Sequence, residues 1–94
     1  MQPRPIRNIY PSQRYVSSFR KLDPQVQQRL IARERLFRAD AYYPGLKTHQ
    51  LGGELGNRGY HAYYVDDKVR IMFSFLSADE VLYIDVSDHA IYRE

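Results

Sequence analysis

The sequence has 94 residues, 44% of them hydrophobic, and a net charge of +3, which together predict one small globular domain. It contains no cysteine, so disulfides, thiolate metal sites and cysteine nucleophiles are excluded. No apolar run approaches the roughly 20 residues of a membrane span, and the first residues do not form a secretory signal. We therefore expect a soluble, cytoplasmic protein with no membrane partner.

The charged residues are unevenly distributed along the chain. Residues 1–38 contain nine basic and two acidic residues, a net charge of +7, whereas residues 39–94 contain five basic and nine acidic residues, a net charge of −4. The basic half would attract a polyanion or an acidic partner, although a solvated helix surface has the same composition.

The first part of the chain predicts a short strand followed by two helices. Residues Arg4–Tyr10 favour a strand that ends at Pro11. Ser12 is suited to cap a first helix, and Asp23 with Pro24 starts a second one, because proline at the first helical position has no N–H to satisfy. Apolar residues recur at helical spacing on one face of each helix: Tyr15, Phe19 and Leu22, then Val26, Leu30 and Phe37. Because almost no linker separates the helices, they are expected to form an antiparallel hairpin.

Residues 40–59 predict an irregular segment. Pro44 and Gly45 favour a turn, and four further glycines interrupt any regular period. Neither a GxGxxG sequence nor a glycine-rich loop followed by Lys-Ser or Lys-Thr is present. We interpret these glycines as tight turns and not as a phosphate-binding loop.

Three strands follow, over residues 60–65, 69–76 and 80–87. The short polar turns between them predict an antiparallel meander. The predicted fold class is therefore α+β: a small single domain over residues 1–94, in which an antiparallel β-sheet packs on an N-terminal two-helix hairpin.

The alternation of side chains along each strand assigns residues to the two faces of the predicted sheet. In the middle strand Ile71 and Phe73 point toward the helices, and Arg70 points to the opposite, free face. In the last strand the same alternation assigns Tyr83 and Asp85 to the free face. A guanidinium inside a strand needs an anionic partner or water, so Arg70 is the first candidate for a functional side chain.

The segments LKTHQLGGELGNRGYHAYYV, KVRIMFSF and VLYIDVSDHAIYR, preceded by a strand and a helical hairpin, resemble the RelE/ParE superfamily of toxins from type II toxin–antitoxin modules. The resemblance covers about residues 6–93. The pattern LKTHxL…HxIY is most similar to the RelE branch. That resemblance implies an mRNA interferase, a metal-independent endoribonuclease that cleaves mRNA on the ribosome and so inhibits translation. It also implies an acidic, neutralising antitoxin in a hetero-oligomer, the mRNA and the ribosome as partners, and no cofactor.

Two alternatives stay open within the same fold. ParE-like relatives inhibit DNA gyrase, so the chain would then be a non-catalytic binder. The other alternative is a catalytically weak homologue that acts only through its antitoxin interface.

The resemblance implies site residues position by position. His49 matches the histidine of the family's loop motif, and Arg70 matches the strand arginine that contacts the scissile phosphate. His89 and Tyr92 match the histidine and the aromatic residue at the C-terminal end. Several relatives carry a second basic residue one strand earlier, where this chain has Tyr64. The candidate catalytic residues are thus His49, Arg70, His89 and Tyr92, and the candidate RNA-binding residues are Lys47, His61, Tyr64 and Asp85.

Cleavage of RNA without a metal needs a base for the 2′-hydroxyl, an acid for the leaving 5′-oxygen and a cation for the charge on the phosphorane. Histidine suits the first two roles, so His49 and His89 are assigned as acid and base in either order. The fork of donors on Arg70 suits the third role. In a purely structural interpretation Arg70 forms a buried ion pair with Asp85. The spacing of the three histidines does not favour a zinc site.

Overall fold

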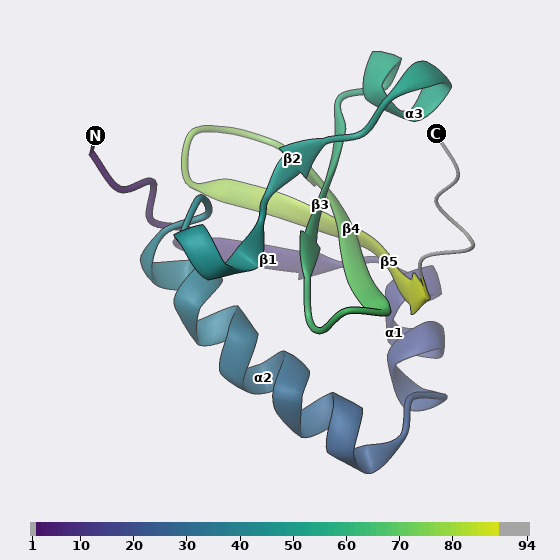
Figure 1. Cartoon of the computed structure of the whole chain (residues 1–94). Coiled ribbons are helices and arrows are strands. Elements are labelled where there is room, and N and C mark those ends of the chain that lie inside the picture. Colours follow the sequence, from purple (N-terminus) through teal and green to yellow (C-terminus); the bar gives the residue numbers. More distant parts are fainter. Residues whose placement is uncertain (1, 89–94) are drawn as a thin grey trace.

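The structure is a computed structural model that describes residues 2–88. Its elements follow in the order β1 (Asn8–Pro11), α1 (Gln13–Arg20), α2 (Pro24–Ala39), the 3₁₀ turn η1 (Pro44–Leu46), β2 (His49–Gln50), α3 (Gly53–Asn57), β3 (Tyr60–Tyr64), β4 (Val69–Phe75) and β5 (Glu80–Asp88) (Figure 1). This is the expected α+β fold. None of the helices described is long and apolar enough to cross a membrane.

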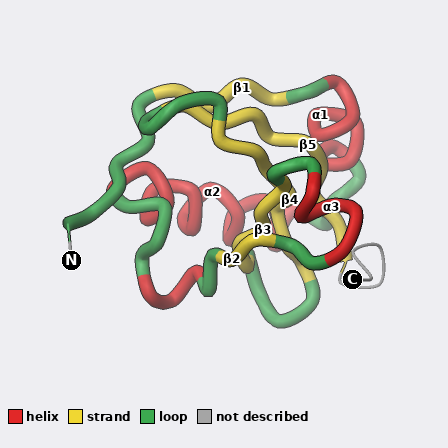
Figure 2. The backbone as a smooth tube through the Cα atoms, turned by 90° about the horizontal axis from the view of Figure 1, so that it is seen from above, coloured by secondary structure: helices red, strands yellow, loops and turns green. Residues whose placement is uncertain are grey.

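The five strands form one sheet in the order β1-β5-β4-β3-β2 (Figure 2). The pairs β2–β3, β3–β4 and β4–β5 are antiparallel, which confirms the predicted meander. Strand β1 lies parallel to β5 at the other edge. Backbone hydrogen bonds from Arg7 to Asp79 and from Ser12 to Tyr83 extend this pairing beyond both ends of β1. Strand β4 is thus the central strand of the sheet.

The two long helices begin where the sequence predicts. The Ser12 side chain accepts a hydrogen bond from the Tyr15 N–H at 3.0 Å, and the Asp23 side chain accepts one from the Gln25 N–H at 3.2 Å. Helices α1 and α2 meet at the turn before Pro24 and then diverge along the sheet (Figure 1).

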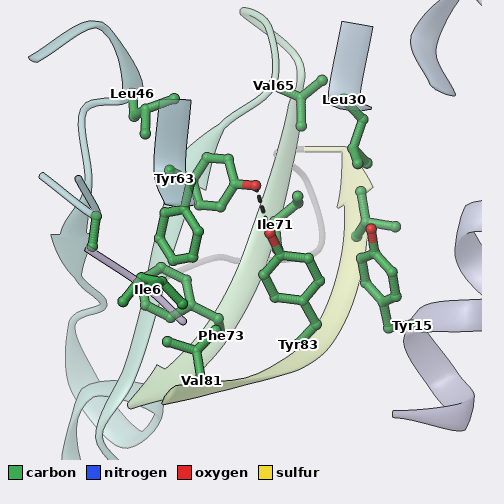
Figure 3. Close-up of a cluster of buried hydrophobic side chains, with 13 residues drawn as sticks. Ile6, Tyr15, Leu30, Leu46, Tyr63, Val65, Ile71, Phe73, Val81 and Tyr83 are labelled. Carbon is green, nitrogen blue, oxygen red and sulfur yellow. Dashed lines mark hydrogen bonds between the residues drawn. The ribbon is translucent and has the colours of Figure 1, made fainter. Parts of the chain in front are cut away.

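The main core lies between these helices and one face of the sheet (Figure 3). The ring of Phe37 stacks on Tyr63 with 4.4 Å between ring centres and meets the edge of Phe73 at 5.0 Å. The hydroxyls of Tyr63 and Tyr83 are buried and lie 2.8 Å apart, so each satisfies the other (Figure 3). The helix residues expected to cover the sheet do so: Tyr15, Leu30 and Phe37 are buried, and Phe19 and Val26 pack against them.

A β-bulge in β5 corrects one of the predicted face assignments. Met72 pairs with Asp85 and Phe73 pairs with Tyr83, which leaves Ile84 without a partner across the ladder. The alternation therefore changes at Ile84, and Tyr83 points into the main core instead of the free face. The assignment of Tyr83 to the free face was wrong, because an extra residue in one strand cannot be seen from alternation alone.

The segment over residues 40–59 is also more ordered than expected. It contains η1, the short strand β2 and the helix α3. A Cβ on Gly56 would lie 1.9 Å from the carbonyl oxygen of Leu51, so only glycine allows this close approach. Helix α3 thereby packs on the free face, where a second cluster gathers around Leu51, Ala62 and Met72.

Candidate active site on the free face of the sheet

Arg70 lies on the free face, near the start of the central strand β4. It lies on β4, opposite Tyr64 of β3 and Ser87 of β5, and is only 8% exposed. Its Nε is buried and has no hydrogen-bond partner among the described residues. A buried guanidinium donor without an acceptor is costly, so this arrangement fits a site that receives an anion from outside the chain.

An aromatic ring holds this guanidinium. The Cζ atom of Arg70 lies 4.2 Å from the ring centre of Tyr64, which is a cation–π contact. The Nζ atom of Lys47 lies 5.4 Å from the same ring centre. Two cations therefore converge on Tyr64, and neither has a carboxylate partner within ion-pair distance in the described part of the chain.

The backbone of Lys47 is strained. Its φ of 54° and ψ of 39° lie in the left-handed region, and no other described residue except glycine has a positive φ. For a residue with a Cβ this conformation costs about 1–2 kcal/mol. The turn η1 imposes it, because Leu46 is fully buried and the Lys47 N–H bonds to the Pro44 carbonyl. Such strain is often retained where a side chain must point in a particular direction.

His49 joins the same group. It pairs across the sheet with Ala62, which belongs to the free-face cluster, and its ring centre lies 6.2 Å from that of Tyr64. Its Nδ1 is 2.9 Å from the Lys47 carbonyl oxygen. Because a carbonyl only accepts, the proton of this hydrogen bond is on Nδ1. The hydrogen bond fixes the orientation of the ring, as an acid or base requires.

Asp85 has a different partner from the one considered in the sequence. It is 3% exposed, and its carboxylate forms an ion pair with Arg14 Nε at 2.9 Å. One of its oxygens also accepts from the Val86 N–H. The structural interpretation in which Asp85 pairs with Arg70 is therefore wrong, and the anion that Arg70 lacks is not Asp85.

His61 lies on the other side of the sheet. Its ring centre is 5.0 Å from that of Phe75 and 5.6 Å from that of Phe73, which is a residue of the main core. The structure thus brings together Lys47, His49, Tyr64 and Arg70, and separates His61 from them. The positions of His89 and Tyr92 lie outside the described residues.

Arg33 of α2 supports the segments that carry the site. Its guanidinium donates to the carbonyl oxygens of Tyr64, at 3.3 Å, and of Gly45. It therefore ties β3 and η1 to α2 and fixes the two segments that carry Tyr64 and Lys47. No group of three His, Cys, Asp or Glu side chains within residues 2–88 could hold a metal ion.

No protein-family model matches the sequence, and no curated protein matches it. Solved structures do match. A YoeB/ParE toxin from Agrobacterium tumefaciens has 13% identity and a TM-score of 0.71, over 88% of this chain and 99% of that chain. A chain of the RelBE2 toxin–antitoxin complex from Mycobacterium tuberculosis has 14% identity and a TM-score of 0.71, over 96% of this chain and 95% of that chain. A chain of the heterotetrameric YoeB–YefM complex from Staphylococcus aureus has 14% identity and a TM-score of 0.67, over 87% of this chain and 95% of that chain. At these identities the shared feature is the fold.

Proposed function

We propose that this chain, which has the fold of the RelE/ParE toxins, is the toxin of a type II toxin–antitoxin module and cleaves mRNA without a metal. The observation that carries the proposal is Arg70, a buried guanidinium whose Nε lacks an acceptor on the face that also presents His49. A phosphodiester supplies the missing anion. The resemblance of the sequence to the RelE branch adds the substrate class, mRNA on the ribosome.

The residues divide the chemistry between them. Arg70 donates to the phosphate and stabilises the charge that develops on the phosphorane. The ring of His49, held by the Lys47 carbonyl, either takes the 2′-hydroxyl proton or gives one to the leaving 5′-oxygen, and His89 takes the other role. Lys47 adds a second positive charge close to Arg70, and Tyr92 supplies an aromatic ring for a base.

The direct test is a pulse of expression followed by primer extension on a translated message. We expect new 5′ ends inside the coding region, and none in the same message without its start codon. A supercoiling assay with purified DNA gyrase separates the alternatives. Intact messages together with blocked supercoiling would favour a ParE-like binder, and intact messages with normal supercoiling would favour an inactive homologue.

The proposed partner is an acidic antitoxin. Two of the three matching structures described above are toxin–antitoxin complexes, and the net charge of +7 on residues 1–38 suits an acidic chain. A co-encoded acidic protein should co-purify with this one and should dissociate more readily as salt is raised. A chain that stays monomeric beside its co-encoded neighbour, and is harmless when expressed alone, would contradict this part of the proposal.

A further inference from the structure

Tyr64 is the aromatic residue of the group that also contains Lys47, His49 and Arg70. It is intermediate in exposure and lies directly across the β3–β4 ladder from Arg70. Directly opposite residues of an antiparallel pair are the closest cross-strand neighbours. The ring of Tyr64 is thus fixed beside Arg70 by the register of the sheet itself.

We propose that Tyr64 is a positioning residue, whose ring holds the guanidinium of Arg70 and the ammonium of Lys47 in place for a phosphodiester. The inference rests on the proposed function for the identity of the anion. The distances of 4.2 Å and 5.4 Å from the ring centre to the two cations carry it. The ring face bears partial negative charge, so it attracts both cations without neutralising either of them.

No carboxylate among the described side chains pairs with Arg70, and this is the second part of the argument. A carboxylate beside Arg70 would satisfy Nε and would compete with phosphate for the same donors. The nearest acidic side chain on this face in the described part of β5, Asp85, is held instead by Arg14 at 2.9 Å. An aromatic ring restrains the arginine side chain and gives its Nε no acceptor, which reduces the ordering cost when the anion binds.

The backbone that carries the Tyr64 ring is itself restrained. The Tyr64 carbonyl accepts from Arg33 Nε at 3.3 Å, and the Arg33 guanidinium also donates to the carbonyl of Gly45 in η1, the turn that strains Lys47. One arginine of α2 therefore couples the strand that carries the ring to the loop that carries the second cation. The ring of Tyr64 fixes the positions of the two cations, and its hydroxyl is not needed for this role.

The experiment compares the wild type with Tyr64→Phe and Tyr64→Leu, and uses Tyr60→Leu as a matched control on the same face of β3. Nitrogen-15 NMR of the arginine Nε–H groups reports the contact directly, because a proton above a ring face is shielded. We expect an upfield Arg70 Nε–H signal in the wild type, Tyr64→Phe and Tyr60→Leu, and its loss in Tyr64→Leu. Thermal melts identify any variant that does not fold.

The functional measurement is the cleavage rate of the folded protein. Tyr64→Leu should lower kcat/KM about tenfold, the size expected for loss of one cation–π contact beside the reacting group. Tyr64→Phe should keep kcat/KM within about twofold. A Tyr64→Leu variant with the wild-type Nε–H shift and wild-type kcat/KM would overturn the inference, as would a Tyr64→Phe variant that falls as far as Tyr64→Leu.

A wild-type protein that cleaves no RNA would refute the proposed function without deciding the role of Tyr64. The Nε–H shift and the affinity for a short 2′-O-methyl oligoribonucleotide, which cannot be cleaved, then decide it. Weaker binding and loss of the shift in Tyr64→Leu alone would support the positioning role, and equal binding by all variants would exclude it.

Discussion

Two histidines on neighbouring strands have the same local geometry in different surroundings. Nδ1 of His49 lies 2.9 Å from the Lys47 carbonyl oxygen, and Nδ1 of His61 lies 3.0 Å from the Gly59 carbonyl oxygen. Each ring is thus held by the carbonyl two residues before it. The difference is the face of the sheet, because His49 shares its face with Arg70 whereas His61 packs on the rings of the core side.

This pair provides an internally controlled prediction. His49→Gln should lower the cleavage rate by about 10²–10⁴-fold, because glutamine cannot transfer a proton. Its side chain is similar in size to that of histidine and can still form hydrogen bonds. His61→Gln should leave the rate within about twofold, since it lies on the opposite face. Rates on one RNA substrate at equal folded protein concentration are the measurement. An equal loss in both variants would remove His49 from the site.

At the scale of the elements, the sequence predicts those features that depend only on residues close together in the chain. Ser12 and Asp23 begin the helices because their side chains accept hydrogen bonds from N–H groups in the first turn. Alternation correctly assigns Arg70 to the free face, because β4 is regular up to Met72. These features need only the neighbouring residues, so they can be inferred without a structure.

Other features depend on contacts between distant segments. The bulge at Ile84 moves Tyr83 into the core, where its hydroxyl meets that of Tyr63. The left-handed backbone of Lys47 follows from the burial of Leu46 at the end of η1. The ion pair of Asp85 with Arg14 joins β5 to α1. None of these has a local sequence signal, so the arrangement around Arg70 could be predicted only in part.

The turn between β3 and β4 is stabilised by one carboxylate. The side chain of Asp66 accepts from the N–H groups of Lys68 and Val69, at 2.8 and 2.7 Å, and forms an ion pair with Arg29 of α2 at 2.7 Å. Burial would raise the pKa of Asp66, but these hydrogen bonds and the Arg29 charge together lower it. The ionised carboxylate therefore stabilises the turn at neutral pH.

We expect Asp66→Ala to cost about 1–2 kcal/mol at pH 7, and Asp67→Ala, at the exposed neighbouring position, to cost less than about 0.5 kcal/mol. Folding lowers the pKa of Asp66. The contribution of its carboxylate to stability is therefore complete above the pKa that Asp66 has in the unfolded chain, and it disappears as the pH falls through the pKa that Asp66 has in the folded chain. Urea unfolding should show a difference in the free energy of unfolding between the wild type and Asp66→Ala at pH 7, and this difference should become small at pH 2. A difference that persists at pH 2 would show that the carboxylate charge is not its cause.

At the scale of the whole molecule, the core is rich in buried phenols. Burial raises the pKa of Tyr15, Tyr63 and Tyr83. The hydrogen bond between the last two lowers the pKa of Tyr63 and raises that of Tyr83, and both stay well above the ordinary value. In the unfolded chain these phenols ionise near pH 10. The unfolded state therefore loses protons first, and the stability that the neutral phenols give is complete below pH 10 and declines above it.

The free energy of unfolding should consequently be nearly constant from about pH 7 to 9 and fall steeply above pH 10, by about 1.4 kcal/mol per pH unit for each buried phenol. Tyr15→Phe should make this slope shallower by the contribution of one phenol. Tyr43→Phe, at an exposed tyrosine, is the control and should leave the slope unchanged. Equal slopes in all three proteins would contradict the burial argument.

The central claim is that Arg70 is held for a phosphate and not for the fold. Its Nε has no acceptor among the described residues, so replacing it removes a buried donor that the described chain leaves unsatisfied. Arg70→Lys should restore only part of the activity of Arg70→Ala, because a lysine cannot make the planar two-pronged contact.

The most direct measurement is the cleavage rate of Arg70→Ala per folded molecule, with its melting temperature recorded in the same samples. We expect a melting temperature close to that of the wild type and a rate about 10²–10³-fold lower, as for the loss of a donor to the transition state. A lower melting temperature with an unchanged rate in the folded fraction would contradict the claim and make Arg70 a structural residue.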